Sequence, residues 1–134
     1  KVELLKGVHN FTATTGNTFK IALYDSDATL GASTTAFSTS EEITNTSGTA
    51  YTSGGASLTS VTPVASSTTA ICDFSDVSYS SASFTANGAL IYNSSASNVA
   101  VCAIAFGSDK TATNGTFTIQ FPTADATNAI IRLA

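Results

Sequence analysis

Residues 88–133 decide the fold: GALIYNSSASNVAVCAIAFGSDKTATNGTFTIQFPTADATNAIIRL. The stretch contains four apolar runs, which are GALIYN, VAVCAIAF, GTFTIQF and AIIRL. Each run carries apolar residues at alternate positions or continuously, and the short joints between them are rich in Ser, Asn, Gly and Asp. Such runs are typical of β-strands, and such joints tolerate turn conformations. We therefore predict antiparallel strands in this part of the chain.

The N-terminal half adds further strand signals. FKIALY, residues 19–24, alternates Phe19, Ile21 and Leu23 with the residues of its other face. Further strands are predicted at residues 56–62, 68–74, 77–84 and 85–93. Their regular spacing, without helices between them, favours a sandwich over parallel βαβ units. We predict one all-β domain over residues 1–134, an antiparallel β-sandwich, jelly-roll-like, with seven or eight strands.

One turn signal stands out within the C-terminal runs. Asn114 and Gly115 lie between strand-like segments, and both residue types accept the positive φ of a type I′ turn. The pair predicts a tight hairpin.

Two segments fall outside the strand pattern. Residues 1–11, KVELLKGVHNF, form a short N-terminal arm with apolar residues near helical spacing, and so short a piece needs its own domain or a neighbour to lie on. Residues 25–55 form a long polar loop region that we expect to hold one short strand or helical turn. Its spaced apolar residues are expected to anchor it: Leu30, Phe37, Ile43 and Tyr51.

The composition excludes some partners and favours assembly. Ser and Thr make up nearly a third of the chain, while charged residues make up 10% and the net charge is -4. The five basic residues are scattered: Lys1, Lys6, Lys20, Lys110 and Arg132. A nucleic-acid partner is not expected, because phosphate binding needs clustered cations. A membrane partner is not expected either, because no apolar stretch approaches the roughly 18 residues of a spanning helix.

Catalytic and metal-binding patterns are weak. The single histidine, His9, lies in the N-terminal arm and is expected to be a surface residue, so no nucleophile has an evident base. Asp25 and Asp27 resemble the start of a calcium loop, but the downstream Gly and Glu are missing. Glu41 and Glu42 are expected to be solvated loop charges. We predict no enzyme activity, no catalytic residues, no metal and no cofactor.

The two cysteines, Cys72 and Cys102, each lie inside an apolar run. They lack the paired spacing of a zinc site or redox motif, so buried free thiols are expected. A disulfide between sheets stays open as the alternative.

Four segments carry a resemblance to a known family: FKIALY at 19–24, AYTSGGASL at 50–58, GALIY at 88–92 and FGSDK at 106–110. In these segments the chain resembles small virion structural proteins of tailed bacteriophages. The resemblance covers most of the chain, with a departure at Ala50, where a second glycine often precedes the tyrosine.

The resemblance implies a non-enzymatic virion component on the capsid exterior, a cement or decoration protein that contacts the major capsid protein or other virion proteins. We expect a homo-oligomer, a dimer or trimer. Four apolar residues are expected to form the capsid-docking arm: Leu4, Leu5, Val8 and Phe11.

Other functions stay open beside this one. A tail, neck or fibre-associated subunit would use the same sandwich in fewer copies. A carbohydrate-binding module is the alternative from another class, with four tyrosines as possible stacking platforms: Tyr24, Tyr51, Tyr79 and Tyr92. A secreted hydrolase is the least favoured, because no acid–base pair can be assembled from these residues.

Overall fold

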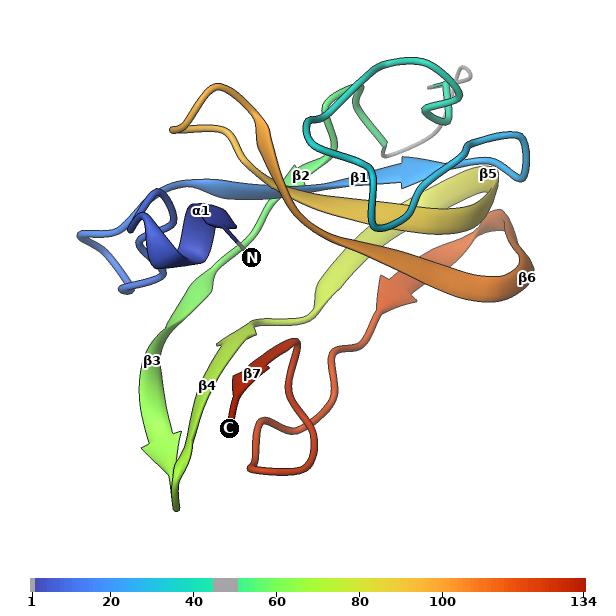
Figure 1. Cartoon of the computed structure of the whole chain (residues 1–134). Helices are drawn as coiled ribbons and strands as arrows, with labels where there is room; N and C mark the ends of the chain where they lie inside the picture. Colours follow the sequence, from blue (N-terminus) through green and yellow to red (C-terminus); the bar gives the residue numbers. More distant parts are fainter. Residues whose placement is uncertain (1, 45–50) are drawn as a thin grey trace.

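The structure is a computed structural model that describes residues 2–44 and 51–134 and shows two antiparallel sheets (Figure 1). The elements are α1 (Val2–Leu5), β1 (Phe19–Tyr24), β2 (Ala56–Ser57), β3 (Ser60–Ser66), β4 (Thr69–Phe74), β5 (Val77–Asn93), β6 (Val99–Ile119) and β7 (Ile131–Leu133). The predicted all-β antiparallel sandwich is confirmed, with seven strands in the described residues. The finer jelly-roll topology stays a prediction. Ala50 and the rest of residues 45–50 in the predicted polar loop lie outside the described residues.

The larger sheet has the order β2-β1-β5-β6, so β1 lies in its interior. The alternation predicted for FKIALY is confirmed, because Phe19, Ile21 and Leu23 belong to the main core. Ala22 and Tyr24 face the other way, into a second and smaller apolar cluster. β1 is therefore buried on both faces, which explains why its sequence is apolar at nearly every position.

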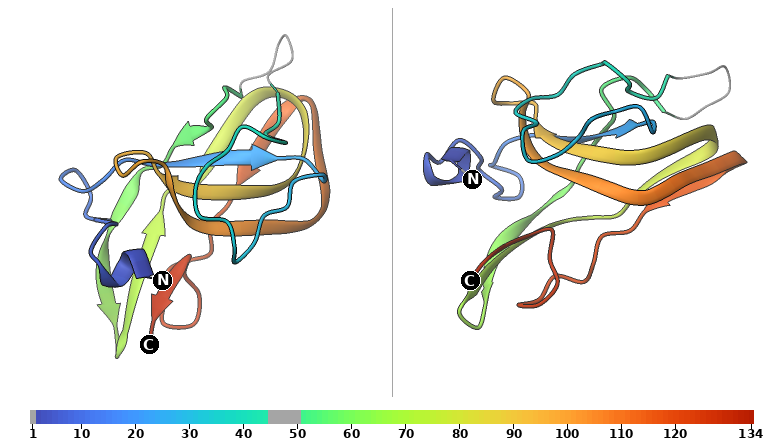
Figure 2. Two further views of the ribbon diagram at one scale, coloured as in Figure 1. Left: turned by 45° about the horizontal axis from the view of Figure 1, so that its top comes forward. Right: turned by 45° about the vertical axis from the view of Figure 1, so that its right-hand side comes forward.

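The smaller sheet has the order β3-β4-β7, and Figure 2 shows it extending away from the larger sheet. Its central strand β4 places Cys72 and Phe74 in the main core. β3 has no buried residue, because it lies at the edge of the part that projects. The run predicted as one strand at 56–62 is thus divided, with β2 in the larger sheet and β3 in the smaller one.

β5 and β6 are longer than predicted. The runs at 77–84 and 85–93 form the single strand β5, and VAVCAIAF and GTFTIQF both belong to β6. The hairpin predicted at Asn114 and Gly115 is wrong, because Gly115 pairs with Ala82 inside the β5–β6 ladder. Asn114 does adopt a positive φ of 47°, but it does so where the register shifts. A residue with positive φ can make a bulge that bends a continuous strand as readily as a turn that ends it.

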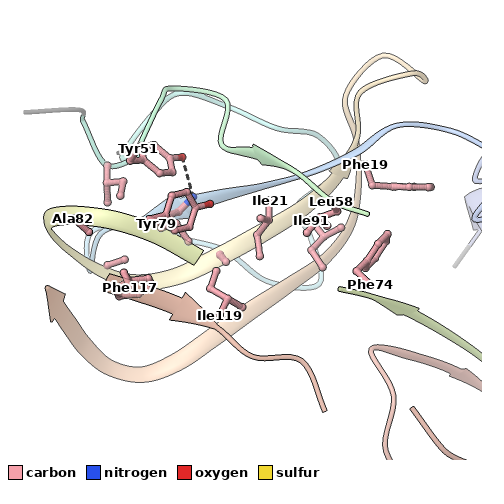
Figure 3. Close-up of a cluster of buried hydrophobic side chains, with 14 of the residues drawn as sticks. Phe19, Ile21, Tyr51, Leu58, Phe74, Tyr79, Ala82, Ile91, Phe117 and Ile119 are labelled. Carbon is pink, nitrogen blue, oxygen red and sulfur yellow. Dashed lines mark hydrogen bonds between the residues drawn. The ribbon is translucent and has the colours of Figure 1, made fainter. Parts of the chain in front are cut away.

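The main core lies on the inner face of the larger sheet, where β5 and β6 curve around it, and β4 of the smaller sheet adds Cys72 and Phe74 (Figure 3). Its aromatic part includes Phe11 stacked on Phe19, with ring centroids 4.5 Å apart. The outer face of the larger sheet is covered by the polar loop region, whose Leu30 and Phe37 pack on the second cluster. Ile43 and Tyr51 are buried in the main core. The predicted anchors of the loop are thus confirmed. The described part of the loop contributes two isolated bridges, Tyr24 to Glu42 and Ala36 to Val99.

Candidate functional site

The N-terminal arm is only partly available for docking. Leu5 is 91% exposed, whereas Leu4 is half-buried against the main core and Val8 is half-buried. Phe11 is buried, with 7% of its surface exposed. Its inclusion in the predicted docking arm is wrong, because its ring fills the chain's own core between Phe19 and Phe74.

His9 and Asn93 fasten the arm to the end of β5. The buried Asn93 amide donates to Asn17 Oδ1 at 3.0 Å and to the carbonyl of Val8 at 3.3 Å, and it lies 3.1 Å from His9 Nδ1. The His9 ring lies beside Phe11 and Phe19. Partial burial lowers the pKa of His9, opposed by the charge of Glu3. His9 is therefore half-buried and not the surface residue that was expected, and its contacts are those of a packing residue.

The clearest buried polar site is centred on Glu42, which is 6% exposed. Its carboxylate accepts three hydrogen bonds, from the Tyr51 hydroxyl at 2.6 Å, the Ser53 hydroxyl at 2.7 Å and the Gly54 amide at 2.6 Å. The prediction that Glu42 is a solvated loop charge is wrong, because its bridge to Tyr24 holds it against β1. The neighbouring Glu41 is exposed, as predicted.

Tyr51 links this carboxylate to the sheet. Its oxygen accepts the amide of Leu23 at 3.0 Å, in the interior of β1. Burial raises the pKa of Tyr51, and its hydrogen bond to Glu42 raises it further. The hydroxyl stays protonated and has no exposed surface, so a substrate has no access to it. The Glu42 site holds the loop on the sheet and is not suited to acid–base catalysis.

Two glycines complete the attachment of the loop. Gly54 and Gly55 have positive φ values of 87° and 72°. A Cβ atom on Gly55 would collide with the carbonyl oxygen of Ile21 in β1. The Tyr92 hydroxyl donates to the Gly54 carbonyl at 2.7 Å. The glycine pair therefore lets the backbone approach the sheet closely, and it is not a phosphate loop.

A group of acids lies at the end of β1. Asp25, Asp27 and Glu41 place one carboxylate oxygen each within 4.8 Å of one another. Asp25 Oδ1 also accepts the amide of Asp27 at 3.0 Å, as in an ordinary Asx turn. Carboxylate oxygens suit a hard cation, but these side chains lie at the surface, where groups of acidic residues are common without a bound ion.

Both cysteines are free thiols, as predicted, but only Cys72 is buried and Cys102 is half-buried. Burial raises the pKa of Cys72 to about 12 and that of Cys102 to about 11. Thiols of this kind react slowly, because the thiolate is the nucleophile.

The tyrosines do not form sugar-stacking platforms. All four are at most 5% exposed: Tyr24, Tyr51, Tyr79 and Tyr92. That prediction is wrong, because the sheet alternation and the covering loop turn every tyrosine ring into one of the two apolar clusters.

An apolar groove of about 760 Å³ lies between β6 and the segment that follows it. Its apolar lining includes Ile104, Phe106, Phe117, Ile119, Phe121 and Ile130. Lys110 is the one charged residue among the described residues that line it. Sequence reasoning missed the groove, because the inward alternation of these residues indicates a filled core. β6 is instead the edge strand of its sheet, so part of its inner face stays open.

Comparison of the chain with protein-family models, with curated proteins and with solved structures gave no match. Among residues 2–44 and 51–134, no helix has the length and apolar character needed to span a membrane.

Proposed function

We propose that the chain is a non-enzymatic structural subunit of a tailed-bacteriophage virion, and that it decorates the exterior of the capsid as a cement protein. The observation that carries this proposal is where the exposed apolar side chains gather. Val61 and Val64 on β3 are 46% and 57% exposed, and Leu133 on β7 is 59% exposed. All three lie on the smaller sheet, which projects from the body of the fold (Figure 2).

The projecting sheet is suited to contact two protein partners at once. Val64 lies opposite Ile71 and Leu133 lies opposite Ala70. Ile71 and Ala70 are neighbours in β4, so the two exposed side chains stand on opposite faces of the sheet. A projection that is apolar on both faces can insert between two capsid subunits and contact each of them.

The chemistry of the chain is consistent with assembly. Among the described residues, the buried acid Glu42 is used to hold a loop. Only 10% of its residues are charged, so neighbouring copies repel each other weakly. A cement protein acts through many modest contacts, each of which opposes separation of the subunits that it bridges.

The proposal is tested by quantitative mass spectrometry of purified virions of the phage that encodes the chain. We expect a copy number comparable to that of the major capsid protein. A handful of copies would instead indicate the tail, neck or fibre-associated role, and complete absence would overturn the virion proposal.

The docking surface is tested on particles that lack the chain. Purified protein is added back, and bound and free fractions are separated by sedimentation. We expect Val64→Asp and Leu133→Asp to reduce binding at least tenfold, because each places a charge in an apolar contact. Thr113→Asp, which changes an exposed residue of β6 in the other sheet, is the control and should bind normally.

A further inference from the structure

We propose that two copies of this chain associate by exchanging arms, so that the arm tip of each copy, Val2–Leu5, lies in the apolar groove of the other. This inference goes beyond the proposed function and does not depend on it, because it concerns the purified chain alone.

Two apolar side chains of the arm tip, Val2 and Leu5, lack adequate cover in their own chain, whereas Leu4 packs against the main core. Val2 is 56% exposed and Leu5 is 91% exposed. The α-helix that carries them has four residues, none of which is buried. A helix this short is not stable without packing, and burial of an exposed leucine side chain is stabilising. The arm tip therefore gains stability from a second surface.

The groove has the complementary shape and composition. Its volume of about 760 Å³ falls within the roughly 300–1,000 Å³ of ordinary binding pockets. Ile104, Phe106, Phe121 and Ile130 line it and are only half-buried. A small ligand is normally buried over most of its surface, which so open a groove does not provide. A segment of polypeptide, which needs burial on one face only, fits it better.

One pair of opposite charges is available between the arm and the groove. Lys110 is the charged residue at the groove, and the arm tip carries Glu3 between Val2 and Leu4. The chain has only five basic residues, so a cation beside an apolar groove is a specific feature of this surface. Lys1 and Lys6 flank the arm tip in the sequence, so the charge contact proposed here is the single pair of Glu3 with Lys110 and not the net charge of the arm.

The arm and the groove lie on the same side of the molecule. Val2 and Glu3 border a hollow together with Cys102 and Ala103. Cys102 and Ala103 also line the groove. A two-fold dimer uses the same patch on both subunits. One continuous patch that contains a convex arm and a concave groove is therefore suited to a reciprocal exchange.

The contact is small beside the roughly 1,200–2,000 Å² of a standard interface. We expect a dimer with Kd in the micromolar range, measured by sedimentation equilibrium over a range of protein concentrations. Glu3→Lys and Lys110→Glu should each weaken the dimer about three- to thirtyfold, and the double variant should recover most of the loss. Asp27→Lys, an exposed acid-to-lysine change outside the patch, should leave Kd unchanged.

A second pair of variants tests the apolar contact. Leu5→Asp places a charge on the apolar surface of the arm, and Ile130→Asp places a charge in the groove. Each variant alone should therefore be monomeric, and circular dichroism would show that it folds. An equimolar mixture retains one intact arm and one intact groove per pair, and it should recover part of the dimer. A wild-type chain that stays monomeric at several hundred micromolar, a dimer whose Kd is indifferent to Leu5→Asp, or a mixture without recovery would overturn the proposal. Because no capsid is present, failure here leaves the proposed function standing, and the two are judged separately.

Discussion

The hydroxyl of Tyr51 lies 2.6 Å from Oε1 of Glu42, and both residues are buried where the polar loop crosses β1. Tyr51 also accepts the amide of Leu23. Through this contact, two residues of the loop that are nine positions apart are both connected to β1, the interior strand of the larger sheet. It explains how a long segment with almost no regular structure can cover one face of a sandwich.

Tyr51→Phe should destabilise the fold. The change removes one hydrogen-bond donor from a buried carboxylate and leaves the Leu23 amide without its acceptor. An unsatisfied buried group costs about 1–3 kcal/mol, so we expect the free energy of unfolding in urea to fall by that order. Glu41→Gln, an exposed change at the neighbouring position, should alter it by less than about 0.5 kcal/mol. Equal stability of Tyr51→Phe and wild type would show that the contact does not hold the loop.

The comparison of Glu41 with Glu42 shows a feature of the site that could not be predicted from the sequence, which is the burial of one of two adjacent glutamates. The two residues are identical neighbours in a polar loop, and only the tertiary bridge from Glu42 to Tyr24 decides which one is buried. By contrast, the strand Phe19–Tyr24 could be predicted, because its alternation is local to the sequence. The prediction of a hairpin at Asn114–Gly115 was wrong because a residue with positive φ can form a bulge within a strand as well as a turn. The local sequence indicates the positive φ but does not distinguish the two structures.

The groove could not be predicted from the same patterns. Phe117 and Ile119 alternate with polar residues in the manner of any strand that faces a core. Whether that core is closed depends on which strand lies beside β6, and the topology places none of the described strands there. The groove is thus open because none of the described strands lies beside β6, and no sequence motif indicates it.

Stability should decline at alkaline pH. The pKa of Cys72 is raised to about 12 and that of Cys102 to about 11, from an ordinary value of 9.0. Above about pH 9 the unfolded chain therefore loses thiol protons that the folded chain retains, and the folded state is disfavoured. We expect the free energy of unfolding to be level from pH 7 to 8.5 and to fall between pH 9 and 11. The Cys72→Ala, Cys102→Ala double variant should show a shallower fall, and an identical slope would contradict the assignment.

Stability should also decline in mild acid, through His9. Partial burial lowers the pKa of His9 below its ordinary value of 6.5, so the unfolded chain binds a proton first as the pH falls. The free energy of unfolding should decrease from about pH 7 downward more steeply in the wild type than in His9→Gln. Thermal melts at pH 7.0, 6.0 and 5.0 would measure this difference. Parallel curves for the two proteins would show that His9 does not contribute.

Among the described glycines, Gly55 is the one where an added side chain meets the closest backbone contact. Its φ is 72°, and a Cβ atom there would collide with the carbonyl oxygen of Ile21. Gly107 has a similar φ of 77° but meets nothing within 4 Å, and Gly31 has neither constraint. Substitutions at these three glycines therefore separate the strain of a positive φ from the strain of a steric collision with β1.

We expect Gly31→Ala to be neutral or slightly stabilising, because alanine reduces the freedom of the unfolded chain. Gly107→Ala should cost about 1–2 kcal/mol from the left-handed backbone alone. Gly55→Ala should cost clearly more than Gly107→Ala, because the backbone must also withdraw from β1 and weaken the contacts of Gly54 with Glu42 and Tyr92. Urea unfolding of the three variants gives the ranking. If Gly55→Ala and Gly107→Ala cost the same, the close approach of the loop to β1 contributes nothing to stability, and the loop is held by its other contacts, such as the hydrogen bond of Tyr51 to Glu42 and the packing of Phe37.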